Sequence, residues 1–255
     1  MESGAGSVAR LVAGGEGVSV SMRVSYGDCR AVVERLRRAI CGFMVALAVP
    51  LLVSGPAAAA SPEAVHIVVL GDSLTAGFGL PGAAAFPARL QNALEKALAG
   101  KGIKASVGNA GVSGDTSSGG RDRLDWSVPE GTQAVIVELG ANDALRGTDP
   151  AVTRAALADI IARLKARGIA VLLCGMLAPP NYGTDYAARF NAIFPDLARQ
   201  YDVPLYPFFL DGVAADKSLN QADGMHPTAE GVDVIVKRIL PMVEQLVTRA
   251  RARDR

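Results

Sequence analysis

The sequence is poor in the residues that build metal centres, disulfide frameworks and aromatic binding surfaces. It has three cysteines and two histidines in 255 residues, and 5% of its residues are aromatic. Cys29 and Cys41 precede residue 61, which leaves Cys174 without a disulfide partner in the rest of the chain. We expect Cys174, in an apolar strand-like run, to be buried and inert. Because His66 and His226 are far apart in sequence, we predict no metal site.

The sequence also lacks an excess of either charge. Lys and Arg number 26 against 25 Asp and Glu, and hydrophobic residues make up 50% of the chain. This composition is sufficient for a large core, and it gives no electrostatic reason to expect a nucleic-acid partner.

The first sixty residues differ in pattern from the rest of the chain. Basic residues at Arg35, Arg37 and Arg38 precede an apolar run over 39–53, and four alanines follow at 57–60. This order of basic, apolar and small residues is typical of a secretory signal peptide that is cut close to Ser61. Retention as a membrane anchor is an alternative, although the apolar run is short for a spanning helix.

This pattern divides the chain into two predicted parts. Residues 1–60 form a leader with a signal peptide at about 35–60, and residues 61–255 form one domain. We expect a periplasmic or secreted protein with no stable membrane anchor after cleavage. The long stretch before the basic residues leaves Met22 open as the true start of translation.

From residue 65 onward, short apolar runs alternate with longer amphipathic segments. Strands are predicted at 65–70, 103–107, 134–139, 169–174 and 203–206. Helices are predicted at 83–99, 116–124, 150–167 and 185–201, with a last helix from 228 to about 250. Such alternation indicates parallel βαβ units with right-handed crossovers. The predicted fold is a three-layer α/β/α sandwich, flavodoxin-like, with a five-stranded parallel sheet.

Polar, glycine-rich blocks follow the first three predicted strands. They are residues 71–74, 108–116 and 140–143, and a further block, Asp-Gly-Met-His-Pro, stands at 223–227. Loops at the carboxyl ends of parallel strands meet at one edge of the sheet, where such folds bind their ligands. We therefore expect these blocks to converge on one site.

The residue types in these blocks suit acyl transfer. Ser73 is the candidate nucleophile, and it needs a base such as His226 to remove its proton. Asp223, three residues before the histidine, can orient the imidazole and stabilise its charged form. Gly111, through its backbone N–H, and Asn142, through its side-chain amide, can donate hydrogen bonds to an oxyanion.

Each of these residues also has a simpler interpretation. Ser73 alone could cap the helix that follows it, and Gly111 and Asn142 could be turn residues only. Asp72 is a rival for the acid, although its position suggests hydrogen bonds within its own turn. His66 lies at the far end of the first strand and is expected to be structural or exposed.

The four blocks together resemble those of the GDSL, or SGNH, hydrolase family. The family is named for a serine, a glycine, an asparagine and a histidine, and the order Ser73, Gly111, Asn142 and His226 matches its order. The resemblance covers residues 65–245. Further segments, at 109–116, 137–140, 145–147, 181–183 and 203–205, are similar to the bacterial periplasmic thioesterase, lysophospholipase and arylesterase branch.

The resemblance implies a cofactor-free serine hydrolase. It makes Ser73 the nucleophile, His226 the base and Asp223 its orienting acid. The backbone N–H groups of Ser73 and Gly111 and the side chain of Asn142 would form the oxyanion hole. Expected substrates are small esters or thioesters, including aryl esters, acyl thioesters and lysophospholipids.

The sequence also suggests how the acyl pocket is built. We expect Leu145 and the segment 177–186, with Tyr182, to line the acyl pocket and to form a rim that can close. A carbohydrate acetyl esterase or a non-catalytic envelope binding protein on the same fold are the alternatives in function. A Gly-x-Gly-x-x-Gly match at residues 77–82 starts too far past the first strand to predict dinucleotide binding.

Overall fold

The computed structural model describes residues 64–253, and the predicted leader and signal peptide lie outside them. Five strands form the sheet in the order β2-β1-β3-β4-β5, and all neighbouring strands pair in parallel. Their bounds are β1 Val65–Gly71, β2 Ala105–Gly111, β3 Ala134–Glu138, β4 Ala170–Cys174 and β5 Leu205–Tyr206. The predicted fold class is confirmed.

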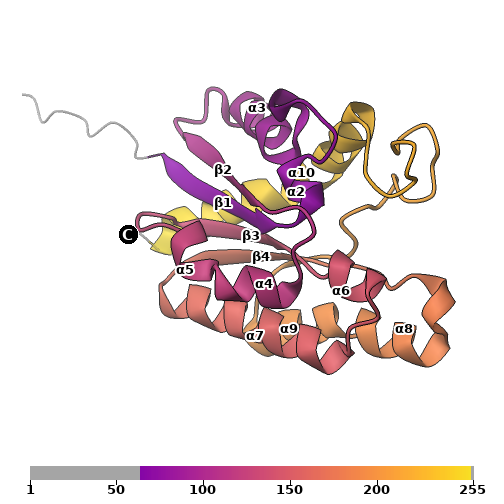
Figure 1. Cartoon of the computed structure of the whole chain (residues 1–255). Coiled ribbons are helices and arrows are strands. Elements are labelled where there is room, and N and C mark those ends of the chain that lie inside the picture. Colours follow the sequence, from indigo (N-terminus) through magenta and orange to yellow (C-terminus); the bar gives the residue numbers. More distant parts are fainter. Residues whose placement is uncertain (1–63, 254–255) are drawn as a thin grey trace, which may run out of the picture. The chain divides into compact units, whose positions relative to one another are not determined.

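Helices cover both faces of this sheet (Figure 1). Helices α3 and α10 pack against each other on one face, while α7 and α9 lie together on the other. The longer helices are α3 Phe86–Leu98, α7 Pro150–Ala166, α8 Thr184–Asn191, α9 Ile193–Tyr201 and α10 Ala229–Arg253. The short ones are α2 Ser73–Ala76, η1 Gly82–Ala84, α4 Ser117–Asp122, α5 Leu124–Ser127, α6 Ala141–Leu145 and η2 Pro180–Tyr182.

Two predicted helices are interrupted in the structure. The helix predicted at 185–201 is divided at Ala192 into α8 and α9. The helix predicted at 116–124 breaks at Arg123, between α4 and α5. No helix among residues 64–253 combines the length and the apolar character that a membrane span needs.

The position predicted for the second strand was wrong. The prediction was 103–107, whereas β2 runs from Ala105 to Gly111 and pairs Gly111 with Gly71 at the end of β1. β2 is an edge strand whose residues are half-buried or exposed, so no apolar run marks it. Residues 108–111, expected in a loop, therefore belong to the sheet.

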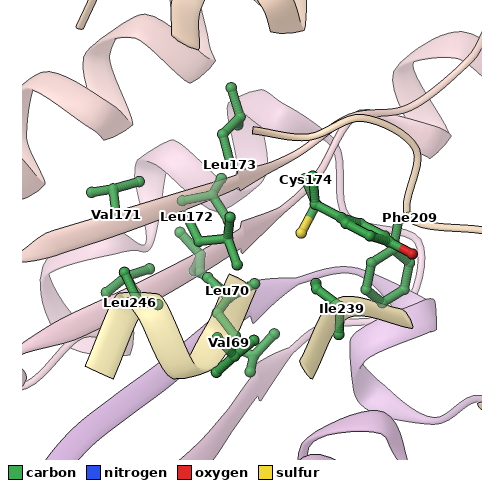
Figure 2. Close-up of a cluster of buried hydrophobic side chains, with 14 of the residues drawn as sticks. Val69, Leu70, Val171, Leu172, Leu173, Cys174, Phe209, Ile239 and Leu246 are labelled. Atoms are coloured by element: carbon green, nitrogen blue, oxygen red, sulfur yellow. The ribbon is translucent and has the colours of Figure 1, made fainter. Parts of the chain in front are cut away.

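Strands β3 and β4 are buried along their whole length, which explains why their sequences are continuous apolar runs. Figure 2 shows Ile239 and Leu246 of α10 beside the strand residues that they cover. Cys174 lies in this cluster and is fully buried. Burial raises the pKa of its thiol well above the usual value. The prediction that Cys174 is buried is confirmed, and the thiol is held in its unreactive neutral form.

Candidate active site

The structure brings Ser73, Asp223 and His226 together in one hydrogen-bonded row. Ser73 is the first residue of α2, at the turn that leaves β1. His226 comes from the loop before α10, and its Nε2 lies 2.9 Å from the Ser73 Oγ. Its Nδ1 lies 2.6 Å from Asp223 Oδ2. Residues 153 positions apart thus meet as a hydroxyl, an imidazole and a carboxylate.

The loop fixes the Asp223 carboxylate in its charged form. Asp223 Oδ1 accepts the backbone N–H of His226 at 3.0 Å and that of Met225 at 2.9 Å. These two hydrogen bonds, with the one from the His226 side chain, lower the pKa of Asp223 to about 2. An ionised carboxylate here calls for a proton on the facing Nδ1. Nε2 is then left to accept the Ser73 hydroxyl proton.

Asp72 lies next to the nucleophile, but its side chain forms hydrogen bonds within the turn and with Asn142. Its Oδ1 accepts Leu74 N–H at 3.0 Å and so caps α2, and its Oδ2 accepts Asn142 Nδ2 at 3.2 Å. Among the described residues, only Asp223 places a carboxylate in hydrogen-bond contact with the imidazole of His226. Burial raises the pKa of Asp72 from 3.8 to about 6.

This raised pKa predicts a pH dependence of stability. Between pH 3.8 and about 6, folded Asp72 keeps a proton that the unfolded chain has released, so its contribution to stability falls as the pH rises. The full change is about 2–3 kcal/mol in the free energy of unfolding. Asp72→Asn should make this slope smaller in urea unfolding measured from pH 4 to 7. The slope that remains comes from the buried Glu138, whose pKa is also raised.

The matched control is Asp122→Asn, because the Asp122 side chain is 67% exposed. It should leave the pH profile as it is in the wild type. A slope in Asp72→Asn as steep as that of the wild type would mean that Asp72 contributes nothing to it.

A buried glutamate supports the nucleophile turn from within the sheet. Glu138, at the end of β3, is fully buried, and its Oε2 accepts Thr75 Oγ1 at 2.7 Å. Gly71 makes this contact possible, since a Cβ there would lie 2.0 Å from Thr75 Oγ1 and 2.5 Å from Glu138 Oε2. Burial, with the nearby Asp72 carboxylate, raises the pKa of Glu138 well above its usual value. Burial therefore favours the protonated form of Glu138.

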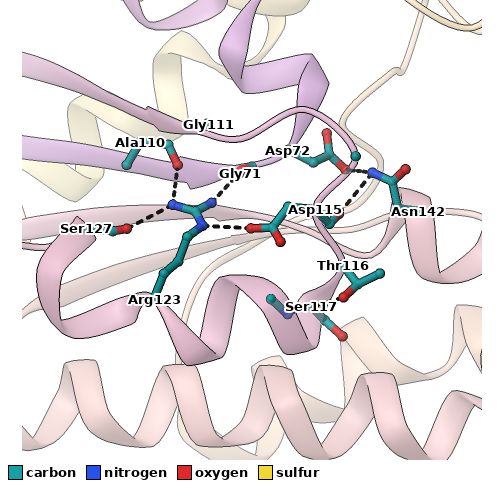
Figure 3. A network of polar contacts seen from close by, with 12 residues as sticks. Gly71, Asp72, Ala110, Gly111, Asp115, Thr116, Ser117, Arg123, Ser127 and Asn142 are labelled. Atoms are coloured by element: carbon teal, nitrogen blue, oxygen red, sulfur yellow. Dashed lines mark hydrogen bonds and ion pairs between the residues drawn. The ribbon is translucent and has the colours of Figure 1, made fainter.

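Arg123 joins the carboxyl ends of β1 and β2 just before the site (Figure 3). Its guanidinium donates to Gly71 O and Ala110 O, each at 2.8 Å, and to Ser127 Oγ at 2.9 Å. It also pairs with Asp115 Oδ2 at 2.7 Å, and both side chains are largely buried. The two strand ends are thereby fixed relative to the loop that carries Asp115.

Replacing Arg123 by methionine should therefore destabilise the fold strongly. The change leaves the Asp115 carboxylate without its cation and takes one donor from each of two strand carbonyls. Breaking such a buried ion pair costs about 3–5 kcal/mol. Urea unfolding at pH 7 measures the loss. Arg121→Met is the control, because its pair with Asp122 is exposed and should cost about 0–1 kcal/mol. Equal losses in the two variants would contradict the structural role of Arg123.

Two of the predicted oxyanion donors already have acceptors. Gly111 N–H donates to Asn109 Oδ1 at 2.9 Å. Asn142 Nδ2 donates to Asp115 O at 2.9 Å and, at the longer distance of 3.2 Å, to Asp72 Oδ2. Figure 3 shows Asn142 between Asp72 and the loop after β2. The amide of Asn142 is thus held in one orientation beside the nucleophile turn.

A cavity of about 540 Å³ opens beside Ser73 and His226. Leu145 lines it, together with Leu177 and Pro180 from the loop after β4. Its remaining wall includes Met176, Phe208, Leu210, Ala214, Ala215 and Met225. None of its lining residues is Asp, Glu, Lys or Arg. Apart from the catalytic end, the cavity is therefore an apolar pocket.

Tyr182 does not line this cavity. Its hydroxyl donates instead to Leu145 O at 2.7 Å, and its ring lies 5.2 Å from that of Tyr186. It therefore contacts the end of α6, and the predicted segment 177–186 lines the cavity through Leu177, Pro179 and Pro180 instead. His66, as expected, is exposed at the far end of β1 and contacts Ser106 Oγ.

The geometry above is matched by similarity to known proteins. The model of the GDSL-like Lipase/Acylhydrolase family matches residues 69–234. The chain belongs to this family.

Curated relatives carry the names of esterases and thioesterases. Esterase TesA of Pseudomonas aeruginosa is 39% identical over 182 residues, which are 71% of this chain and 89% of that protein. Thioesterase 1/protease 1/lysophospholipase L1 of Escherichia coli is also 39% identical, over 69% of this chain and 84% of its own length. The arylesterase of Vibrio mimicus is 39% identical over 68% of this chain and 84% of its own length.

Solved structures agree. The crystal structure of TesA superposes with a TM-score of 0.65 at 37% identity, over 71% of this chain and 99% of that one. Esterase EstA from Pseudoalteromonas, inhibited by monoethylphosphonate, has a TM-score of 0.66 at 28% identity, over 72% and 98% of the two chains. The protein is an SGNH-type hydrolase.

Proposed function

We propose that the protein hydrolyses carboxylic esters and thioesters of apolar acyl groups through an acyl-Ser73 intermediate. One observation carries this proposal: Ser73 Oγ, His226 and Asp223 form a continuous hydrogen-bonded row at the mouth of an apolar cavity. Membership of the hydrolase family supports the reaction class.

The first half-reaction acylates the serine. His226 Nε2 removes the Ser73 proton as Oγ attacks the substrate carbonyl carbon, and the ionised Asp223 stabilises the resulting imidazolium. When the tetrahedral intermediate collapses, the bond to the alcohol or thiol breaks and His226 returns the proton to that leaving group. Water, with His226 again as base, then attacks the acyl-Ser73 ester and releases the acid.

The oxyanion of each intermediate needs fixed donors. Ser73 N–H and Asn142 Nδ2 are two of them, the latter by exchanging its long contact to Asp72 Oδ2 for the oxyanion. We propose Gly114 N–H as the third donor in place of Gly111. The Gly111 N–H donates to Asn109, whereas Gly114 N–H makes no hydrogen bond among the described residues. Asp115, next to Gly114, accepts Asn142 Nδ2.

The cavity favours acyl chains over acetylated sugars. Its wall is formed mainly by aliphatic side chains, alanines and prolines, and it offers few polar groups for sugar hydroxyls. The curated relatives are named as an arylesterase and as a thioesterase and lysophospholipase. The corresponding substrates, which are aryl esters, acyl thioesters and lysophospholipids, share an acyl group that fits such a pocket. The predicted leader supports export to the periplasm or beyond, which the N-terminal sequence of the mature protein would test.

A fluorophosphonate tests this function without assuming a substrate. The probe should add to Ser73 of residues 61–255, as located by mass spectrometry of the digested protein. His226→Ala should abolish the adduct while the protein stays folded. A folded wild type without an adduct would overturn the proposal and favour the non-catalytic binding protein.

A further inference from the structure

The ring of Phe78 lies against the imidazole of His226. Their centroids are 4.6 Å apart and their planes are inclined by 36°. Phe78 belongs to the loop between α2 and η1, and it is 50% exposed. A phenylalanine this exposed gains little from burial in the core. Its contact with the imidazole therefore calls for a different explanation.

The loop presents Phe78 by means of two glycines. Gly77 and Gly79 have φ values of 82° and 74°, a conformation that other residues rarely adopt. A Cβ at Gly79 would also lie 2.2 Å from Gln221 Oε1. The glycines at residues 77–82, which in sequence matched a dinucleotide-binding pattern, thus shape the turn that carries Phe78.

Hydrogen bonds fix this turn to both partners of the proton transfer. Phe78 N–H donates to Ser73 O at 3.1 Å. Gln221 Nε2 donates to Phe78 O at 2.8 Å and to Pro227 O at 2.9 Å. The Gln221 N–H also donates to His226 O at 2.7 Å. The Phe78 backbone is therefore held to the nucleophile and to the histidine loop at once.

We propose that Phe78 is a positioning residue for His226, an inference that rests on the proposed function. The ring limits rotation of the imidazole, whose hydrogen bonds with the described residues are those at its two nitrogens. Its π face also attracts a cation, and so favours the imidazolium that forms as Ser73 attacks. Two carboxylates act on the same imidazole: Asp223 through a hydrogen bond at Nδ1, and Asp72 electrostatically from the nucleophile turn. Phe78 adds an uncharged contribution to theirs.

Phe78→Leu tests the proposal, because leucine keeps an apolar side chain and removes the π face. We expect kcat for an aryl ester, and the rate constant of fluorophosphonate inactivation, to fall about two- to fivefold with KM unchanged. The acid-side midpoint of the kcat/KM profile should move about half a pH unit lower. Phe78→Tyr should restore all three quantities.

Trp126→Leu is the matched control, because Trp126 is an exposed aromatic residue on α5, outside the site. It should behave as the wild type. A rise in KM alone in Phe78→Leu, or unchanged kinetics, would overturn the proposal. A wild type that fluorophosphonate does not label would overturn the proposed function. A labelled wild type with unchanged kinetics in Phe78→Leu would overturn only the role of Phe78. If Phe78→Leu folds poorly, Phe78→Met replaces it in the same measurements.

Discussion

Replacing Ser73 or His226 by alanine should lower kcat for ester hydrolysis by about 10⁴–10⁶-fold, and replacing both should lower it little further. The two side chains act on one proton, which moves across the 2.9 Å between Oγ and Nε2. Once either side chain is absent, the proton transfer is lost, and removing the other side chain lowers kcat little more. Hydrolysis of an aryl ester by the two single variants and the double variant measures this directly.

The stability of the single and double variants is the control for this comparison. The side chains of Ser73 and His226 form their hydrogen bonds with each other and with Asp223. The free energy of unfolding, measured in urea, should therefore change by about 1 kcal/mol or less in each variant. Cys174 gives no alternative nucleophile, since it is fully buried with a raised pKa. Losses that multiply in the double variant would mean that the two residues act in separate steps.

The sequence was sufficient for the fold because its main signals are local. Buried parallel strands such as β3 and β4 are continuous apolar runs, and amphipathic helices separate them. The same order places the ends of the strands, and therefore the loops of Ser73 and Asn142, at one edge. β2 was misplaced because an edge strand has one side open to solvent and carries no such run.

The contacts that support the site could not be predicted in the same way. Glu138 reaches Thr75 only because β1 and β3 pair in a register that sets it opposite Gly71. Arg123 finds four acceptors on segments whose approach depends on the whole sheet. The only signals in sequence were an acid within the apolar run of β3 and a basic residue eight positions after Asp115.

The acyl pocket illustrates the same limit. Leu145 was predicted because it follows the third strand, whose loop was expected to line the pocket, and it lies in the wall of the cavity. The wall from Phe208 to Ala215 comes from a long connection between β5 and α10 that has no periodic pattern. Asn220 ties this connection to itself, because its side chain donates to Val213 O and Asp216 O at 2.7 Å each.

Asn142→Ala should lower kcat by about 10²–10³-fold with KM nearly unchanged, as is found when one oxyanion donor is removed. The amide donates most strongly when negative charge develops, so the ground-state complex loses little. The variant should also unfold about 1–3 kcal/mol more easily, because Asp115 O and Asp72 Oδ2 lose their donor. Steady-state kinetics on an aryl ester separate kcat from KM, and urea unfolding gives the stability.

Asn109→Ala separates the two candidate backbone donors in the same assay. It removes the acceptor that occupies Gly111 N–H. If Gly114 N–H is the donor, freeing Gly111 gives no advantage and kcat stays within about twofold of the wild type. A clear rise in kcat would instead assign the role to Gly111, as the sequence first suggested. An Asn142→Ala variant that changed KM alone would move Asn142 from stabilising the oxyanion to binding the substrate.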